Sequence, residues 1–247
     1  MKVEIWSDVV CPWCYIGKRR FESALAQFEH RDQVEVIWRS FQLDPRAPQH
    51  GEQKTTAMLA QKYGVSVEQA LKMQERVSTL AAEEGLEYHL DQTRHENTFD
   101  AHRLLHLAAE RGLQGQAEER FFRAHFTEGK ALGNNEMLAQ LAAEVGIAED
   151  DARAVLDGDA YADAVRADIR RARMFGIQGV PFFAVDEQYG VSGAQPAEVL
   201  QEVLEQAWAE SHPLLKIGGA GARGAAESAG TRFPQAPAAE GGGRGPG

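Results

Sequence analysis

Residues 3–14 read VEIWSDVVCPWC, a short apolar run that leads through a polar step into two cysteines separated by two residues. The run from Val3 to Trp6 predicts a β-strand. Pro12 suits the first turn of a helix, where its missing N–H is not needed, so we predict that a helix begins at the motif. The chain has only two cysteines. Their close spacing at a strand–helix junction therefore indicates a Cys-x-x-Cys centre.

The motif Cys11-Pro12-Trp13-Cys14 contains both groups that thiol–disulfide exchange requires, a thiolate that attacks and a second thiol that resolves the mixed disulfide. We expect Cys11 to be exposed at the helix N-terminus, where the helix dipole and free backbone N–H groups stabilise a thiolate. We expect Cys14, one turn inside the helix, to be less exposed and to resolve the mixed disulfide. Trp13 could tune the redox potential or offer an apolar contact to substrate, or it could simply cover the motif.

Three other roles for the cysteine pair stay open at this point. A zinc site would need two further ligands, which two of the eight histidines could supply, because the chain has no other cysteine. A purely structural disulfide is unusual in a reducing compartment. The two thiols could also be inert core residues. The position after a strand and at a helix start favours redox chemistry over all three.

The segment after the motif predicts the first half of an α/β fold. Apolar residues recur with helical spacing from Phe21 to Phe28. Apolar and polar residues then alternate from Val34 to Arg39, which indicates a second strand. Strand, helix and strand in close succession predict a βαβ unit with parallel strands and a right-handed crossover.

The middle of the chain, residues 45–165, is predicted to be helical, with glycines at plausible helix ends. The predicted helices are residues 55–63, 66–84, 97–111, 114–128, 135–146 and 149–156. Asn97 is the predicted N-cap of the third of them. The second half of the fold is predicted to begin with a helix over residues 161–175. A hairpin of strands at 182–185 and 189–191 and a last helix over 196–208 follow it.

Composition and charge restrict the class of partner. Hydrophobic residues make up 43% of the chain and charged residues 26%, which is typical of a soluble globular protein. The net charge of −11 argues against nucleic acid or an anionic membrane as the main partner. The chain has neither a long apolar run nor the pattern of a signal peptide near its start, so we expect a cytoplasmic protein.

Four motifs, in the same order along the chain, resemble the DsbA-like thioredoxin-fold oxidoreductases, specifically their FrnE-like branch. The motifs are SDVVCPWCYIG at 7–17, NTFDAHRL at 97–104, GVPFF at 179–183 and VSGAQ at 191–195. The resemblance implies an α/β thioredoxin fold with a large all-helical insertion between its βαβ and ββα halves. The predicted parts are the N-terminal half at 1–44, the insertion at 45–165, the C-terminal half at 166–210 and a disordered Gly/Pro-rich tail at 211–247.

The same resemblance implies roles for particular residues. Cys11 and Cys14 would be catalytic, and the Val180–Pro181 peptide bond would be cis and lie beside them. The implied substrate-binding residues are Pro12, Trp13, Val180, Pro181, Asn97 and His102. One departure concerns Ile5, which occupies the position where thioredoxins usually carry a buried acid, and neither Glu4 nor Asp8 can be assigned that acid's role.

The function that follows is disulfide exchange with protein or low-molecular-weight thiols such as glutathione, without a cofactor. Two alternatives are a glutathione-dependent isomerase related to 2-hydroxychromene-2-carboxylate isomerase, which typically has serine where this chain has Cys11, and a redox-independent chaperone-like binding protein. The choice between a monomer and a homodimer stays open.

His102 and His106 have a spacing that suits a metal, but without a third ligand we predict no metal site. Phe121, Phe122 and Phe126 are predicted to pack in a helical core rather than to line a substrate groove.

Overall fold

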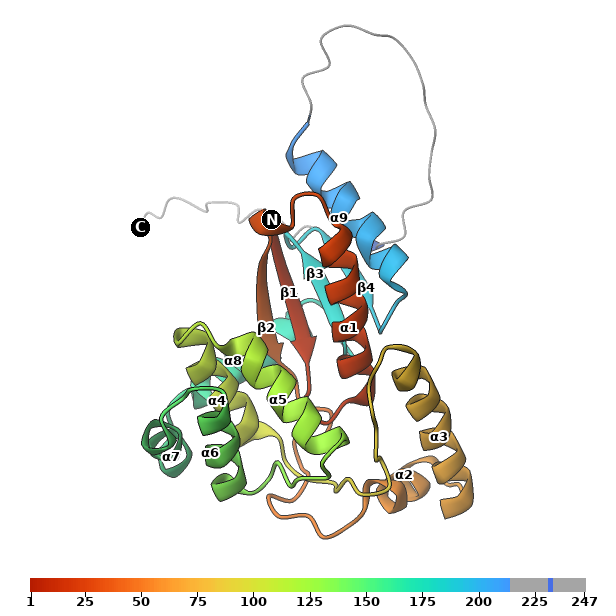
Figure 1. The fold of residues 1–247 in the computed structure, drawn as a ribbon, viewed down its shortest axis with the longest axis vertical. Coiled ribbons are helices and arrows are strands. Elements are labelled where there is room, and N and C mark those ends of the chain that lie inside the picture. Colours follow the sequence, from red (N-terminus) through yellow and green to blue (C-terminus); the bar gives the residue numbers. More distant parts are fainter. Residues whose placement is uncertain (214–230, 233–247) are drawn as a thin grey trace, which may run out of the picture.

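The structure is a computed structural model that describes residues 1–213 and 231–232. Within these residues the strands form one sheet in the order β2-β1-β3-β4-β5, and a group of helices lies beyond one end of it (Figure 1). The strands are β1 (Lys2–Ser7), β2 (Glu35–Ser40), β3 (Phe182–Val185), β4 (Tyr189–Ser192) and β5 (Thr231–Arg232). The helices are α1 (Pro12–Gln27), α2 (Thr55–Tyr63), α3 (Val67–Glu83), α4 (Phe99–Glu110), α5 (Gln114–Phe126), α6 (Asn135–Glu144), α7 (Glu149–Asp157), α8 (Ala162–Met174) and α9 (Ala197–Ser211).

The sheet has helices on both faces, and the side chains of β1 alternate between the two. β1 pairs in parallel with β2, as the predicted βαβ unit requires, and antiparallel with β3. Val3 and Ile5 belong to a buried cluster with residues of α1 and α9. Trp6 points to the opposite face and packs with Ala172 of α8. This alternation is the ordinary consequence of strand geometry. It places Ser7 on the α1 side, at the end of the strand that leads to the cysteines.

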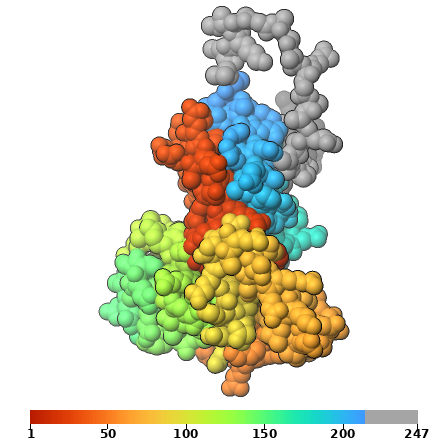
Figure 2. Space-filling view, turned by 45° about the vertical axis from the view of Figure 1, so that its right-hand side comes forward, coloured from red at the N-terminus to blue at the C-terminus, as the bar shows by residue number. Residues whose placement is uncertain are grey.

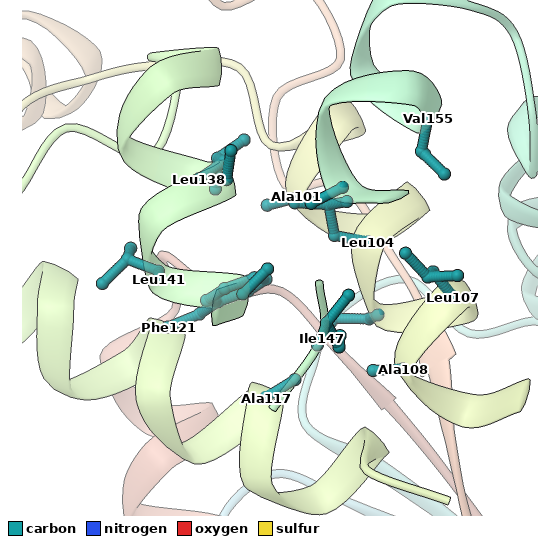
Figure 3. Packing of buried hydrophobic residues seen from close by; sticks show 14 of the residues in the cluster. Ala101, Leu104, Leu107, Ala108, Ala117, Phe121, Leu138, Leu141, Ile147 and Val155 are labelled. Carbon is teal, nitrogen blue, oxygen red and sulfur yellow. The ribbon is translucent and has the colours of Figure 1, made fainter. Parts of the chain in front are cut away.

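The insertion between β2 and β3, helices α2 to α8, has a separate buried cluster (Figure 3). Leu104 and Leu107 of α4, Phe121 of α5 and Leu138 of α6 are central to it. Val9, which follows β1, is fully buried in the same cluster. The loop between β1 and α1 is therefore anchored in the core of the insertion. In the space-filling view, the insertion forms the wide lower part of the molecule, and the sheet with its helices forms the narrower upper part (Figure 2).

Most predicted elements are present with boundaries shifted by a few residues, and α2 covers the predicted range. The predicted N-cap at Asn97 is wrong by one residue, because α4 begins at Phe99 with Thr98 in the cap position. The Asn97 side chain still accepts a hydrogen bond from the Phe99 backbone N–H, at 2.9 Å. It also donates to the carbonyl groups of Pro45 and Ala47, so it orders the preceding loop as well as the helix start.

Two predicted boundaries differ from the structure. The insertion boundary at residue 165 falls inside α8, because that helix continues from the insertion and packs against β2. The tail predicted to be disordered from residue 211 includes Ser211, which ends α9, and Thr231–Arg232, which pair with β4. The rest of that tail lies outside the described residues. Within the described ranges, no helix is both long enough and apolar enough to cross a membrane.

Candidate active site

The two cysteines lie at the start of α1, as the strand–helix pattern predicts. Cys11 occupies the N-cap position with an extended backbone, and its side chain makes no capping hydrogen bond. Pro12 is in the first turn, and the Cys14 N–H donates to the Cys11 carbonyl at 3.0 Å. Both thiols are free. The sulfur of Cys11 is therefore held at the helix end that favours an anion.

The predicted exposure of Cys11 is wrong for this conformation, because only 3% of the residue is accessible, compared with 1% for Cys14. Both cysteines belong to an apolar cluster that the insertion completes with Tyr88, Phe122 and Phe126 among others. The Tyr88 hydroxyl donates to the Pro12 carbonyl at 2.8 Å, which fixes the insertion against the motif. The sequence pattern gave no sign of this cover, since it comes from a distant segment of the chain.

Trp13 is the exposed residue of the motif, with 39% of its surface accessible. It stands between the two buried cysteines in sequence and belongs to the first turn of α1. Phe121, Phe122 and Phe126 are buried and pack in apolar clusters, as predicted. Within the described residues, an apolar contact to a substrate beside the motif is therefore available from Trp13 but not from these phenylalanines.

The loop before β3 lies against the cysteines. The Val180–Pro181 peptide bond is cis, as the resemblance implied. The Cys11 thiol donates to the Val180 carbonyl, with 3.5 Å between sulfur and oxygen. Gly17 of α1 makes room for this loop, because a Cβ atom at Gly17 would lie 2.8 Å from Cγ of Pro181. The close approach of α1 to the proline loop thus depends on a glycine at this position.

The two thiols differ in their surroundings. Burial raises the pKa of Cys14 well above its ordinary value, and the neighbouring Cys11 thiol adds to this effect. The Asp8 backbone and the Ser7 side chain oppose the rise without cancelling it. Cys14 therefore holds its proton at neutral pH and must lose it before it can attack a disulfide.

A layer of buried polar side chains lies behind the cysteines. The Ser7 hydroxyl donates to Oε1 of Glu118 at 2.8 Å. Nε2 of His102 lies 3.3 Å from Oδ1 of Asp8. Burial raises the pKa of Glu118 to about 7, and burial lowers the pKa of His125 to about 4. Burial disfavours the charged form of His102 as well, but the hydrogen bond and charge of Asp8 outweigh it and raise the pKa of His102.

The structure places His102 behind the motif rather than at an open cleft, since only 1% of the residue is accessible. Its hydrogen bond to Asp8 connects α4 to the loop that precedes Cys11. His106 turns to other partners, Ser40 and Asp168, so the two histidines do not share a ligand. In residues 1–213 and 231–232, no group of three or more metal-binding side chains is arranged to hold a metal.

Known proteins that resemble this chain identify its family. The sequence matches the DSBA-like thioredoxin domain family over residues 2–205. The chain belongs to this DsbA-like family. It is similar to the crystal structure of a probable DsbA oxidoreductase, SCO1869 from Streptomyces coelicolor, with 51% sequence identity and a TM-score of 0.83, covering 88% of this chain and 94% of that one.

Two further proteins resemble the DsbA-like chain more distantly. The uncharacterized protein YwbO of Bacillus subtilis (strain 168) is 27% identical over 205 residues, which cover 82% of this chain and 94% of YwbO. A structure of 2-hydroxychromene-2-carboxylate isomerase matches with a TM-score of 0.63 but only 13% identity, covering 85% of this chain and 98% of that one. The second likeness shows a shared fold alone and does not support isomerase activity.

Sequence reasoning did not single out Ser7, Tyr88 or Glu118 in this DsbA-like protein. Glu118 had a detectable signal, because Glu118, Phe121, Phe122 and His125 are spaced to share one face of α5, and all four are buried. A carboxyl group in an apolar stripe is unusual enough to indicate a special role. Ser7 and Tyr88 have no comparable pattern around them.

Proposed function

We propose that this chain is a thiol–disulfide oxidoreductase that exchanges disulfides with protein or low-molecular-weight thiols through Cys11 and Cys14. The observation that carries the proposal is the position of the reduced pair. Cys11 is at the front of α1, with its sulfur 3.5 Å from the carbonyl of Val180 in the cis-proline loop. Cys14 is one turn behind and buried. The 51% identity to a probable DsbA oxidoreductase supports the same reaction class.

The proposed exchange has two steps. The Cys11 thiolate attacks one sulfur of a partner disulfide, so a Cys11–partner disulfide forms and the other partner sulfur leaves as a thiolate. Cys14 then loses its proton and attacks the Cys11 sulfur, which closes the Cys11–Cys14 disulfide and releases the second partner sulfur. The partner gains two electrons and the cysteine pair loses two. The reverse sequence oxidises a partner dithiol.

The surroundings of the motif suggest how a partner binds. Trp13 offers an exposed apolar surface next to the pair, and the backbone of Val180 lies beside Cys11. An extended partner segment that runs along the cis-proline loop would bring its sulfur to Cys11. We further propose that the protein belongs to the FrnE-like branch and acts in the cytoplasm, where glutathione is an abundant partner.

Single-cysteine variants test the proposal. Cys11→Ser is expected to abolish exchange with glutathione disulfide, because no attacking sulfur remains. Cys14→Ser is expected to stop the reaction at the Cys11–glutathione mixed disulfide, which intact-protein mass spectrometry detects. Wild-type protein should instead accumulate the internal disulfide. Exchange by Cys11→Ser at the wild-type rate would refute the proposal.

A further inference from the structure

The resolving thiol needs a proton acceptor, and the sheet does not provide one. Ile5 occupies the strand position where thioredoxins usually carry a buried acid, and its side chain packs with Phe21 and Phe183 in the apolar core. Glu4 points elsewhere, because it pairs with Arg39 and Arg171. Asp8 is bound by the Leu43 N–H and faces His102. The proton of Cys14 therefore has no direct carboxylate partner on β1 or on the loop that follows.

The helical insertion brings a carboxyl group to the other side of Ser7. The Ser7 hydroxyl donates to Oε1 of Glu118, at 2.8 Å. The same side chain acts to lower the pKa of the Cys14 thiol, which places it next to the resolving cysteine. Glu118 is 1% accessible, and its second oxygen, Oε2, has no hydrogen-bond partner among the described residues. Ser7 thus lies between the resolving thiol, whose pKa it affects, and a buried carboxylate that still has spare acceptor capacity.

We propose that Glu118 accepts the proton of Cys14 through the Ser7 hydroxyl during the resolving step. The inference rests on the proposed function, because it assigns the proton acceptor for the second half of that exchange. The Cys14 S–H proton passes to the Ser7 oxygen while the Ser7 hydroxyl proton passes to Oε1 of Glu118. The products are a Cys14 thiolate, an intact Ser7 hydroxyl and a neutral Glu118. The Cys14 thiolate then displaces the partner sulfur from Cys11.

The charges around Glu118 fit a group that both accepts and returns a proton near neutral pH. Burial raises its pKa to about 7, and Asp8 adds to the rise. Ser7, His102 of α4 and Lys18 of α1 act in the opposite direction and keep the ionised form accessible. Arg39 of β2 lines a small pocket together with Glu118 and His102, but its guanidinium pairs with Glu4 and Asp168. A general base is most effective when its pKa lies near the working pH.

A pH-jump experiment on the full-length protein isolates the resolving step. The chromogenic disulfide DTNB first converts Cys11 into a mixed disulfide at about pH 4, where thiols are largely protonated and resolution is slow. A stopped-flow jump to final values from about pH 5 to about pH 9 then starts resolution, and release of the coloured thiolate reports attack by Cys14. The wild-type rate is expected to rise with a midpoint near pH 7, as the Glu118 carboxylate forms.

Glu118→Gln keeps the shape of the side chain and an oxygen that can accept from Ser7, but it cannot take up the proton. We expect its resolving rate at neutral pH to fall by about tenfold or more and the midpoint near pH 7 to disappear. Ser7→Ala interrupts the relay and should give the same loss. The matched control is Glu119→Gln, which removes a charge from the next position of α5, where the carboxylate faces Arg19 and Lys18 instead.

The outcomes separate this inference from the proposed function. If Glu118→Gln and Ser7→Ala resolve the mixed disulfide at the wild-type rate and with an unchanged pH profile, the relay is overturned and the exchange reaction stays intact. A wild-type protein that forms the mixed disulfide but never releases the second thiolate would overturn the exchange reaction itself. A fall in the Glu119→Gln control as large as that in Glu118→Gln would also reject the relay, because the effect would then come from net charge.

Discussion

Glu118 and Glu119 are neighbours on α5, yet their carboxyl groups have opposite environments. Burial raises the pKa of Glu118 to about 7. Burial also disfavours ionisation of Glu119, but hydrogen bonds from Arg19, Lys18 and Tyr15 outweigh it and lower the pKa of Glu119 to about 2. One helix turn thus presents a carboxyl group that titrates near neutral pH and another that stays ionised throughout the physiological range.

The pH dependence of stability should differ in sign between these two residues. Folded Glu118 retains a proton that the unfolded chain releases above its ordinary pKa of 4.5, so the wild type loses stability between about pH 4.5 and 7. Glu118→Gln removes this loss. We expect its free energy of unfolding, relative to wild type, to be about 3 kcal/mol higher at pH 8 than at pH 4. Urea unfolding at the two pH values measures the difference, which cancels any pH-independent cost of the buried amide.

Glu119→Gln is the opposite case and serves as the control. The lowered pKa of Glu119 stabilises the fold above the ordinary value of 4.5, and this contribution is lost as the pH falls towards 2. The variant should therefore be less stable than wild type at pH 7 and similar to it near pH 2. A parallel pH profile for the two variants would contradict the assignment of both carboxyl groups.

Gly17 supports the active site by leaving space. Gly17→Ala would place a Cβ atom 2.8 Å from the Pro181 ring, so either α1 or the cis-proline loop must shift. We expect a loss of about 1–3 kcal/mol in the free energy of unfolding and slower exchange at Cys11. Gly115→Ala is the matched control, because no atom lies within 4 Å of the added carbon. Gly115 is in the first turn of α5, so alanine there should be neutral or stabilising.

At the scale of elements, α3 begins with a capping box, in which two side chains accept hydrogen bonds from backbone N–H groups of the helix start. The Ser66 side chain accepts from the Gln69 N–H, and the Gln69 side chain accepts from the Ser66 N–H. The far end of this helix contributes Ala81 to the cysteine cluster, with Val77 and Leu80 packed against it. The stability of α3 therefore bears directly on the cover of the redox pair.

Removal of the cap is expected to loosen that cover. Ser66→Ala should cost about 1 kcal/mol, because it leaves first-turn N–H groups without an acceptor. Amide hydrogen exchange across α3 measures the effect, which should appear as faster exchange in this helix. Ser78→Ala, in the middle of the same helix, is the control and should leave exchange unchanged or slightly slower. Equal changes in both variants would argue against the capping box as the cause.

Local patterns were sufficient to predict most of the elements but not the contacts between distant segments. The range of α2 follows from apolar spacing and from Gly64, whose φ of +64° ends the helix. The Ser7–Glu118 hydrogen bond joins residues 111 positions apart, and no local pattern indicates such a pairing. The burial of Cys11 under Tyr88 has the same origin. These features depend on how the insertion docks, which periodicity does not encode.

At the scale of the whole molecule, the sheet and the insertion share residues. Val9 lies in the core of the insertion, and Cys11, Cys14, Tyr15 and Ile16 complete a cluster that also contains insertion side chains. Neither part can lose its packing without exposing side chains of the other. Figures 1 and 2 show this junction between the upper and lower parts of the molecule.

This shared packing predicts a single cooperative unfolding transition. The four tryptophans, Trp6, Trp13, Trp38 and Trp208, all lie outside the insertion, so their fluorescence reports on the sheet and its helices. Far-UV circular dichroism reports mainly on helices, most of which belong to the insertion. Urea midpoints from the two signals should coincide. Two separated midpoints would show that the parts unfold independently.

The low accessibility of Cys11, 3%, sets a kinetic ceiling on its reactions. We expect a partner disulfide to reach the sulfur only in those molecules where the insertion segment around Tyr88, which packs in the cysteine cluster, has moved aside. At low partner concentration the velocity is proportional to concentration. At high concentration it saturates at the frequency of this opening, whatever the chemical reactivity of the partner. Fast and slow partners would then share one limiting velocity, which belongs to the protein and not to the thiol chemistry.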